Sequence, residues 1–212
     1  MNHPQQREHL VATAIAMNAS GINVGTTGNL SLRSNAGMLI TPSRTPYADL
    51  QPRDIVPVNM DGTWPEGQTP SSEWRFHRDI YLQRPDAQAI VHAHPVHCSA
   101  LASLHRPIPA FHYMVAVAGG KDIRCCGYAT YGTQELSDQV LAALQDRKAC
   151  LMANHGLVCL ESTLPRALAL AIEVENLART YCQALQIGEP VILDDAEMQR
   201  VMAKLGGKGS NA

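Results

Sequence analysis

Two histidines, one residue apart in an apolar run, constrain this chain more than any other feature. His92 and His94 lie in the segment Ala-Ile-Val-His-Ala-His-Pro at 89–95. Residues two apart on a strand share a face, so both imidazoles should project together. Imidazole is the commonest metal ligand near neutral pH, and two would supply half of a tetrahedral site. The pair alone leaves a second interpretation open, in which one histidine is an ordinary half-buried residue.

Composition limits the classes of protein to consider. A chain of 212 residues with 45% hydrophobic residues is expected to form one domain with a sizeable core. The formal net charge of −2 gives no indication of a nucleic-acid or anionic membrane partner. No apolar run approaches the roughly 20 residues of a membrane-spanning helix, and the first residues lack a signal-peptide pattern. Six cysteines without a Cys-x-x-Cys pair favour reduced thiols in a cytoplasmic protein.

Hydrophobic periodicity and turn residues predict several helices and strands along the chain. The predicted helices and strands cover most of the sequence, and the first strands follow one another as apparent hairpins. We therefore expect a single α/β domain over residues 1–205, with a mixed, mostly antiparallel central sheet flanked by helices, and a flexible tail over 206–212. Helices are expected at 5–20, 71–83, 95–104, 133–144, 164–185 and 194–205. Strands are expected at 22–33 after a glycine turn, 37–43 ending in a polar turn, 54–58 at a sheet edge, 89–94, 125–131 as strand and turn, and 149–159 as a strand broken by Asn-His-Gly.

Small polar residues cluster in three turns. The Gly-Thr-Thr-Gly-Asn segment at 25–29 offers backbone and side-chain donors to an oxyanion, although an ordinary hairpin turn explains it equally simply. Ser43 ends a predicted strand in a polar turn. Ser71 and Ser72 open a predicted helix, where one serine would be the N-cap and two hydroxyls would suit an anion. No Gly-x-Gly-x-x-Gly or Walker pattern occurs, which argues against nucleotide binding.

His155 is a third candidate ligand, because it interrupts an apolar segment as part of Asn-His-Gly. Three neutral imidazoles with an open position form a catalytic metal site rather than a closed structural one. Glu73 could be a fourth ligand or a general base. A metal-bound carbonyl acidifies the neighbouring C–H bond, which suits aldol cleavage, epimerisation or dehydration of a phosphorylated sugar. Glu173 and Glu175, in the long predicted helix, are expected on its solvated side.

Taken together, these motifs resemble the class II aldolase/adducin family, and within it the members that act on L-fuculose 1-phosphate. The similarity runs from the first helix to about residue 200, and the matches fall in order and at the family's spacing. The segments that carry it are Gly-Thr-Thr-Gly-Asn at 25–29, Leu-Ile-Thr-Pro at 39–42, Pro-Ser-Ser-Glu-Trp-Arg-Phe-His at 70–77, Val-His-Ala-His at 91–94, Ile-Pro-Ala-Phe-His-Tyr-Met at 108–114 and Asn-His-Gly-Leu at 154–157.

The resemblance implies a reaction and an assembly. The reaction would be reversible cleavage of a ketose 1-phosphate to dihydroxyacetone phosphate and an aldehyde, with one Zn²⁺ per subunit or with Mn²⁺ or Co²⁺ in its place. The assembly would be a four-fold symmetric homotetramer with active sites at subunit interfaces. The implied roles are zinc ligation by His92, His94 and His155, zinc capping and proton transfer by Glu73, phosphate binding by Gly28, Asn29, Ser43, Ser71 and Ser72, and proton transfer at a neighbouring subunit's site by Tyr113.

Departures from the family pattern concern the aldehyde end of the substrate. Arg44 replaces a glycine beside the phosphate loop, where it could add a phosphate contact, narrow the pocket or point into solvent. Tyr131 replaces a phenylalanine near the aldehyde end, and the tail after Leu205 lacks a tyrosine that the family carries near its carboxyl terminus. Arg44, Tyr131 and Thr26 are candidate substrate contacts. A 5-deoxy- or 5-methylthio-pentulose 1-phosphate would suit the same chemistry.

The sequence leaves three other functions open. The related ribulose-phosphate 4-epimerases carry aspartate where this chain has Glu73, which favours an aldolase. A methylthioribulose-1-phosphate dehydratase or a decarboxylase of the family would share the metal ligands. A non-catalytic, adducin-like binding domain is the third alternative, although adducin heads have lost the ligands that this chain keeps.

Overall fold

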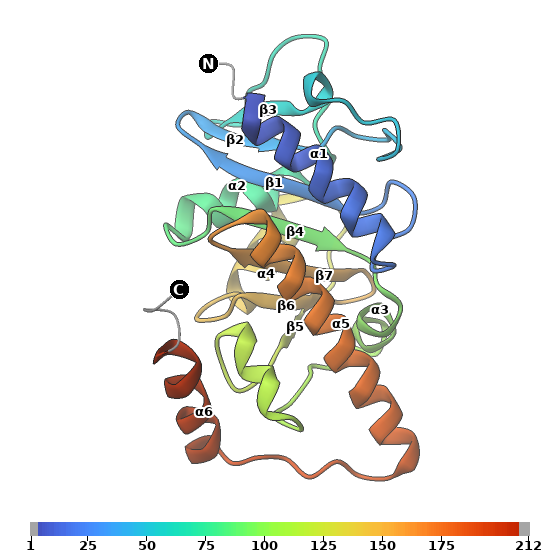
Figure 1. Ribbon diagram of the computed structural model, residues 1–212, viewed down its shortest axis with the longest axis vertical. Coiled ribbons are helices and arrows are strands. Elements are labelled where there is room, and N and C mark those ends of the chain that lie inside the picture. The colour runs from blue at the N-terminus through green and yellow to red at the C-terminus, as the bar shows by residue number, and fades with distance from the viewer. Residues whose placement is uncertain (1–3, 208–212) are drawn as a thin grey trace.

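A seven-stranded sheet forms the centre of the computed structural model, which describes residues 4–207 (Figure 1). Its strand order is β3-β2-β1-β4-β7-β6-β5. Every neighbouring pair is antiparallel except β5 with β6. The prediction of a mixed, mostly antiparallel sheet is therefore confirmed. The strands are β1 (Asn29–Ser34), β2 (Gly37–Ile40), β3 (Val56–Asn59), β4 (Ala89–Ala93), β5 (Arg124–Cys126), β6 (Ala149–Met152) and β7 (Gly156–Glu161).

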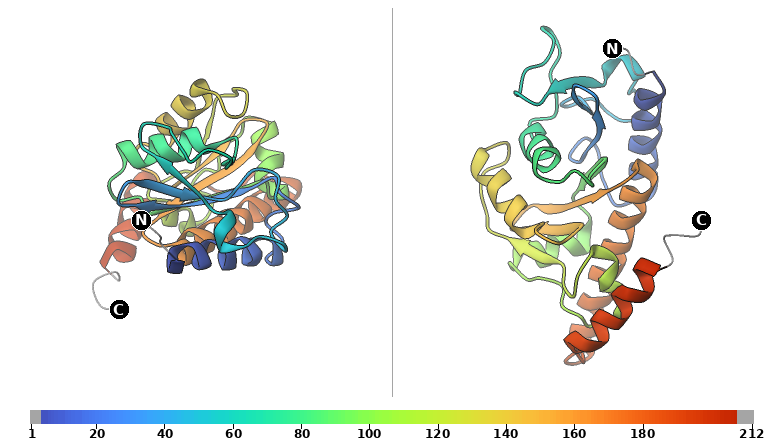
Figure 2. Two further views of the ribbon diagram at one scale, coloured as in Figure 1. Left: turned by 90° about the horizontal axis from the view of Figure 1, so that it is seen from above. Right: turned by 90° about the vertical axis from the view of Figure 1, so that its left-hand side faces the viewer.

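Helices cover both faces of this sheet, which gives three layers (Figure 2). On one face α1, α3 and α5 enclose the larger apolar cluster, and on the other α2 and α4 enclose a smaller one. None of the helices within residues 4–207 is long and apolar enough to cross a membrane. The helices are α1 (Pro4–Ala19), α2 (Trp74–Gln83), α3 (Val96–Ser103), α4 (Gln134–Ala143), α5 (Leu164–Ile187) and α6 (Asp195–Gly207), with short 3₁₀ turns η1 (Pro52–Asp54) and η2 (Tyr113–Ala118).

Strand β4 lies fourth in the order, between β1 and β7, and its side chains alternate between the two layers. Ala89, Val91 and Ala93 belong to the larger cluster, while Ile90 belongs to the smaller one. The same alternation turns His92 toward the α2 side, where it is fully buried. The sequence pattern of the histidine strand thus sets which face of the sheet carries the candidate site.

Local structure differs from the sequence-based expectation in two places. The apolar segment 149–159 is a hairpin of two strands, β6 and β7, because Asn154 adopts a left-handed conformation with φ 54° and reverses the chain. The N-cap of α2 is Glu73 and not a serine, so Ser71 and Ser72 lie in the turn before the helix.

Two further expectations concern the second half of the chain. Glu175 is not on a solvated face of α5: its carboxylate accepts hydrogen bonds from the backbone N–H groups of His97 and Cys98, at 3.0 and 2.9 Å, and so caps α3. Of the tail predicted over 206–212, Gly206 and Gly207 are the last residues of α6, and 208–212 lie outside the described range.

Candidate metal centre and active site

Strand β4 delivers two imidazoles to one point. The Nε2 atoms of His92, in the strand, and His94, just beyond its end, lie 2.9 Å apart. The Nδ1 of His92 donates a hydrogen bond of 2.8 Å to the carbonyl of Leu157 on β7. This bond fixes the tautomer, so that the lone pair of Nε2 points into the site, which is the arrangement that metal-ligating histidines adopt.

His155 joins the pair from the turn between β6 and β7. Because β7 pairs with β4, this turn lies beside the end of the histidine strand. The ring centroid of His155 is 4.9 Å from that of His92 and 4.7 Å from that of His94. Gly156 permits this close approach, since a Cβ there would lie 2.4 Å from the carbonyl oxygen of Ala93. The structure therefore brings together three histidines that are up to 63 residues apart in sequence.

Glu73 completes the cluster from the start of α2. Its Oε2 lies 3.0 Å from Nε2 of His92, and its Oε1 lies 3.3 Å from Nε2 of His155. Asn29 lies opposite His92 in the β1–β4 register and donates 3.0 Å from its Nδ2 to Oε2 of the same carboxylate. One ligand atom from each of Glu73, His92, His94 and His155 lies within 4.8 Å of the others.

Electrostatics favour an ionised carboxylate beside two neutral imidazoles, those of His94 and His155. Burial acts to lower the pKa of His92, but the Glu73 carboxylate outweighs burial and raises it. Burial acts to raise the pKa of Glu73, but the neighbouring His92, His155 and the Asn29 amide together lower it to about 2. Burial and the charge of His92 lower the pKa of His94 to about 3 and that of His155 to about 4. Neutral imidazole is the form that binds a metal, so His94 and His155 are available as ligands at neutral pH.

These residues fit a divalent metal ion. The Oε1 atom of Glu73 is buried and accepts no hydrogen bond from the residues of 4–207. A buried carboxylate oxygen without a donor is costly, and a bound cation would satisfy it. Three imidazoles and one carboxylate form a donor set typical of Zn²⁺, and Mn²⁺ or Co²⁺ also accept it. A group of four that could hold a metal is thus present, and its chemistry does not by itself select the ion.

Two of the predicted phosphate-binding turns lie side by side. Pro42 and Pro70 form an isolated antiparallel bridge, and the N–H of Ser43 donates 3.1 Å to the carbonyl of Thr69. This pairing joins the turn that carries Ser43 to the turn that carries the Ser71–Ser72 pair. Ser72 is exposed, while Ser71 is buried and accepts a hydrogen bond of 3.3 Å at its Oγ from the N–H of Glu73.

The third turn, at 25–29, places Gly28 and Asn29 in buried contacts with neighbouring residues of the protein. Gly28 packs against β4, since a Cβ there would lie 2.5 Å from the carbonyl oxygen of His92 and 2.6 Å from Oδ1 of Asn23. Asn29 is buried and bonded to Glu73 and, through its Oδ1, to Nε2 of His77 at 2.5 Å. Phosphate binding by this turn stays a prediction.

The remaining candidate contacts lie outside the metal cluster. Thr26 is exposed in the turn before β1, and Tyr131 is exposed next to Gly132, whose carbonyl accepts from Arg75 on α2. Arg44 is exposed and holds a left-handed conformation with φ 61°. Glycine adopts that conformation without steric cost, which gives a physical reason for the glycine that the resembling family pattern has at this position.

Tyr113 begins η2 and stacks on the ring of His112, with centroids 4.8 Å apart. Its side chain is 51% exposed, and within the described residues no hydrogen bond or ring contact joins it to the four ligands. Its role at a neighbouring subunit's site stays a prediction.

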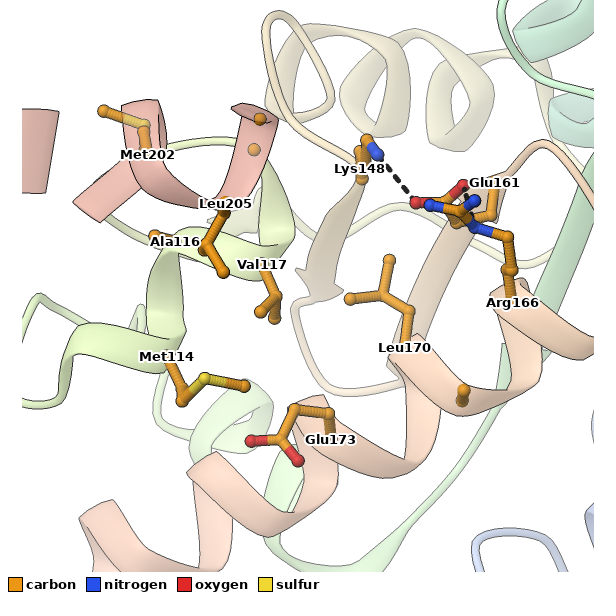
Figure 3. A pocket seen from close by; sticks show the side chains of 13 residues that line it. Met114, Ala116, Val117, Lys148, Glu161, Arg166, Leu170, Glu173, Met202 and Leu205 are labelled. Carbon is orange, nitrogen blue, oxygen red and sulfur yellow. Dashed lines mark hydrogen bonds and ion pairs between the residues drawn. The ribbon is translucent and has the colours of Figure 1, made fainter. Parts of the chain in front are cut away.

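A cavity of about 710 Å³ is lined by residues of η2, α5 and α6 (Figure 3). Met114 and Leu170 line its apolar part, and Lys148 and Glu161 form an ion pair at one edge. None of the four candidate ligands lines this cavity. This cavity is therefore separate from the four candidate ligands, and the convergence of the ligands defines the candidate site.

No sequence motif singled out His77, a fully buried histidine on α2. It follows Glu73 by four residues, a spacing that places two side chains on the same face of a helix. That spacing was the available signal, but the partners of His77 on β1 could not be read from it.

Comparison with known proteins identifies the family. Residues 8–182 match the model of the family described as Class II Aldolase and Adducin N-terminal domain. The chain belongs to this class II aldolase and adducin family. It is similar to proteins named as aldolases, and it is an enzyme of this lyase type.

Three of these similar proteins illustrate the range. A 5-methylthioribulose-1-phosphate/5-deoxyribulose-1-phosphate aldolase of Rhodospirillum rubrum is 53% identical over 206 residues, covering 97% of this chain and 93% of the relative. An L-fuculose phosphate aldolase of Escherichia coli K12 is 48% identical over 205 residues, covering 96% and 95%. A solved structure of an L-fuculose 1-phosphate aldolase has a TM-score of 0.94 at 40% identity and covers 97% of this chain and 98% of its own. The resemblance inferred from the sequence motifs is confirmed.

Proposed function

We propose that this protein cleaves a ketose 1-phosphate reversibly to dihydroxyacetone phosphate and an aldehyde, using a zinc ion held by His92, His94 and His155. The convergence of these three imidazoles with Glu73 supports this proposal more than any other observation. Zinc, when bound, would polarise the carbonyl of the dihydroxyacetone phosphate half and stabilise the negative charge that develops there. Mn²⁺ or Co²⁺ is the alternative ion.

Glu73 is proposed as both the fourth ligand of the resting site and the acid–base group. Its carboxylate lies among the ligand nitrogens and stays ionised, because its pKa is lowered to about 2. In cleavage the group returns a proton to the carbon next to the carbonyl, and in condensation it removes that proton. A positioned carboxylate of this kind contributes typically about 10²–10⁴-fold to rate.

The phosphate group of the substrate is proposed to bind at the polar turns beside α2. Ser43, Ser71 and Ser72 lie on two turns that are joined by backbone bonds, and Ser71 and Ser72 precede the N-terminus of a helix of ten residues. The N-terminus of α2 adds a favourable partial positive charge. Gly28 and the amide of Asn29 are proposed to complete this phosphate site from the neighbouring strand.

Thr26, Arg44 and Tyr131 are proposed as further substrate contacts, with Arg44 beside the phosphate loop and Tyr131 near the aldehyde half. Relatives named for L-fuculose phosphate and for 5-methylthioribulose or 5-deoxyribulose 1-phosphate are of comparable similarity, at 48% and 53% identity. We propose L-fuculose 1-phosphate or a 5-deoxy- or 5-methylthio-pentulose 1-phosphate as the substrate. Arg44 and Tyr131, where this chain departs from the family pattern, would decide which of these substrates is preferred.

The active form is proposed to be a homotetramer in the cytoplasm. Tyr113 is half exposed and lies outside the metal cluster of its own chain, which is the position expected of a residue that serves a neighbouring subunit. There it would transfer the proton of the hydroxyl group on the carbon atom whose C–C bond breaks. The six cysteines are free thiols, in keeping with a reducing compartment.

The first test is a coupled assay of dihydroxyacetone phosphate release from L-fuculose 1-phosphate and from 5-deoxyribulose 1-phosphate, with and without a chelator. Chelator-sensitive release supports the proposal, and the ratio of the two kcat/KM values ranks the aldehyde halves. Absence of release from both by the zinc-loaded protein would contradict it and favour a dehydratase, epimerase or decarboxylase of the family. A protein that takes up no metal would instead be an adducin-like binding domain.

A further inference from the structure

Behind the candidate acid–base group, five polar side chains form a buried row. Glu73, His77 and Tyr81 follow one another at four-residue intervals along α2, and Asn29 and Ser31 lie two residues apart on β1. None of the five is more than 4% exposed. The helix face and the strand face pack against each other, so the polar groups alternate between them.

Each member of this row is hydrogen-bonded to the next. Tyr81 Oη lies 2.8 Å from Ser31 Oγ, and Ser31 Oγ lies 2.7 Å from His77 Nδ1. His77 Nε2 lies 2.5 Å from Asn29 Oδ1, and Asn29 Nδ2 lies 3.0 Å from Glu73 Oε2. The row ends on the carboxylate that faces the metal ligands.

The carboxylate fixes the direction of every bond in the row. An ionised Glu73 only accepts hydrogen bonds, so Asn29 must present its amide nitrogen to it and its carbonyl oxygen to His77. The imidazole must then donate from Nε2, which leaves Nδ1 as an acceptor for the hydroxyl of Ser31. Ser31, having donated its proton, accepts from Tyr81.

The opposite arrangement is unfavourable. With the proton on Nδ1, the lone pair of His77 Nε2 would face the carbonyl oxygen of Asn29 at 2.5 Å, two acceptors without a proton between them. A protonated His77 would place a charge in a fully buried position. Burial lowers the pKa of His77 to about 3 and raises that of Tyr81, so the ring is neutral and the phenol keeps its proton.

We infer that His77 is a positioning residue for the acid–base group: as a neutral imidazole protonated at Nε2, it orients the Asn29 amide, which in turn holds the Glu73 carboxylate toward the metal and the substrate carbon. This inference rests on the proposed function for its consequence in catalysis. The tautomer and the hydrogen-bond directions follow from the geometry alone.

Two matched substitutions separate positioning from packing. In His77→Gln the side-chain amide nitrogen reaches the place of Nε2 and still donates to Asn29. In His77→Asn the shorter side chain reaches only the place of Nδ1, so the contact with Ser31 can persist while the donor to Asn29 is lost. Both variants lose the aromatic ring, and only one loses the bond that matters here.

The expected result is a division between the two variants. His77→Asn should lower kcat about 10–100-fold, the usual effect of removing a group that orients a ligand, with little change in KM. His77→Gln should retain most of kcat at equal zinc content and similar melting temperature. Equal losses in both variants, or a loss confined to KM, would overturn the positioning role.

Ring-¹⁵N NMR of the wild-type protein supplies a readout that is independent of activity. The two-bond correlations of an Nε2–H tautomer differ from those of an Nδ1–H tautomer, and the His77→Gln spectrum identifies the signal by its absence. An Nε2–H signal for His77 supports the inference, and an Nδ1–H or doubly protonated ring refutes it. If the wild-type protein has no aldolase activity, the proposed function fails, and the NMR result still decides the tautomer.

Discussion

Substitution of Glu73 by glutamine tests the central chemical claim with little change in shape. Glutamine has the same length as glutamate, and its carbonyl oxygen can still accept the 3.0 Å bond from Asn29. Its amide nitrogen would replace Oε1, which faces Nε2 of His155 at 3.3 Å, a nitrogen that can accept. The variant is therefore expected to fold and to keep three imidazole ligands for the metal.

The expected loss follows from the role of the carboxylate. Glutamine cannot take or return a proton, so the full contribution of the acid–base group should disappear, about 10²–10⁴-fold in rate. This factor corresponds to about 3–5 kcal/mol of transition-state stabilisation. The rate of Glu73→Asp should lie between those of the wild-type protein and Glu73→Gln. Shortening the side chain withdraws the carboxylate by about 1 Å, and a displacement of this size lowers the rate about 100-fold.

Exchange of the dihydroxyacetone phosphate C–H proton with deuterated solvent, followed by NMR, measures this step without the aldehyde. Zinc content is determined on the same samples, and Glu66→Gln, an exposed carboxylate in the loop before α2, serves as the matched control. Exchange at the wild-type rate in a zinc-loaded Glu73→Gln protein would refute the assignment of Glu73 as the base.

Three further predictions concern metal, backbone and pH. Chelation of the metal should abolish activity and lower the melting temperature, and added Zn²⁺ should restore both, because a ligand that binds only the folded state stabilises it. An unchanged melting temperature after chelation would argue against the metal site. Arg44→Gly should stabilise the protein by about 0.5–1 kcal/mol. The change relieves about 1–2 kcal/mol of strain in the left-handed backbone at this position, and the greater conformational entropy of glycine in the unfolded chain offsets about 0.5–1 kcal/mol of that gain. Thermal melts measure the difference, and a lower melting temperature would contradict the strain argument. In the metal-free protein, His77, with a folded pKa of about 3 against about 6.5 unfolded, contributes stability that is complete above about pH 6.5 and is lost as pH falls toward 3. His77→Gln should therefore make the pH dependence of unfolding shallower by one proton, about 1.4 kcal/mol per pH unit, in chemical denaturation between pH 4 and 6; identical slopes would exclude a buried neutral histidine.

Much of the architecture follows from local patterns. The first and last helices, the edge position of the proline-containing β3 and the start of α4 next to Thr133 all match their sequence signals. These signals succeed because periodicity, capping and turn chemistry act over a few neighbouring residues. Glu175 shows the limit: nothing on α5 indicates that its carboxylate caps a helix 77 residues earlier.

By itself, the sequence determined the identity of the metal-site candidates. The alternation of a strand forces His92 and His94 onto one face, and motif order points to His155 and Glu73 as their partners. Only the tertiary structure decided how these groups are oriented. The β1–β4 register places Asn29 opposite His92, and the packing of α2 on β1 inserts His77 behind the carboxylate. Those contacts are hydrogen bonds between strands and helices far apart in sequence, and burial makes each of them obligatory because an unpaired polar group in the core is too costly.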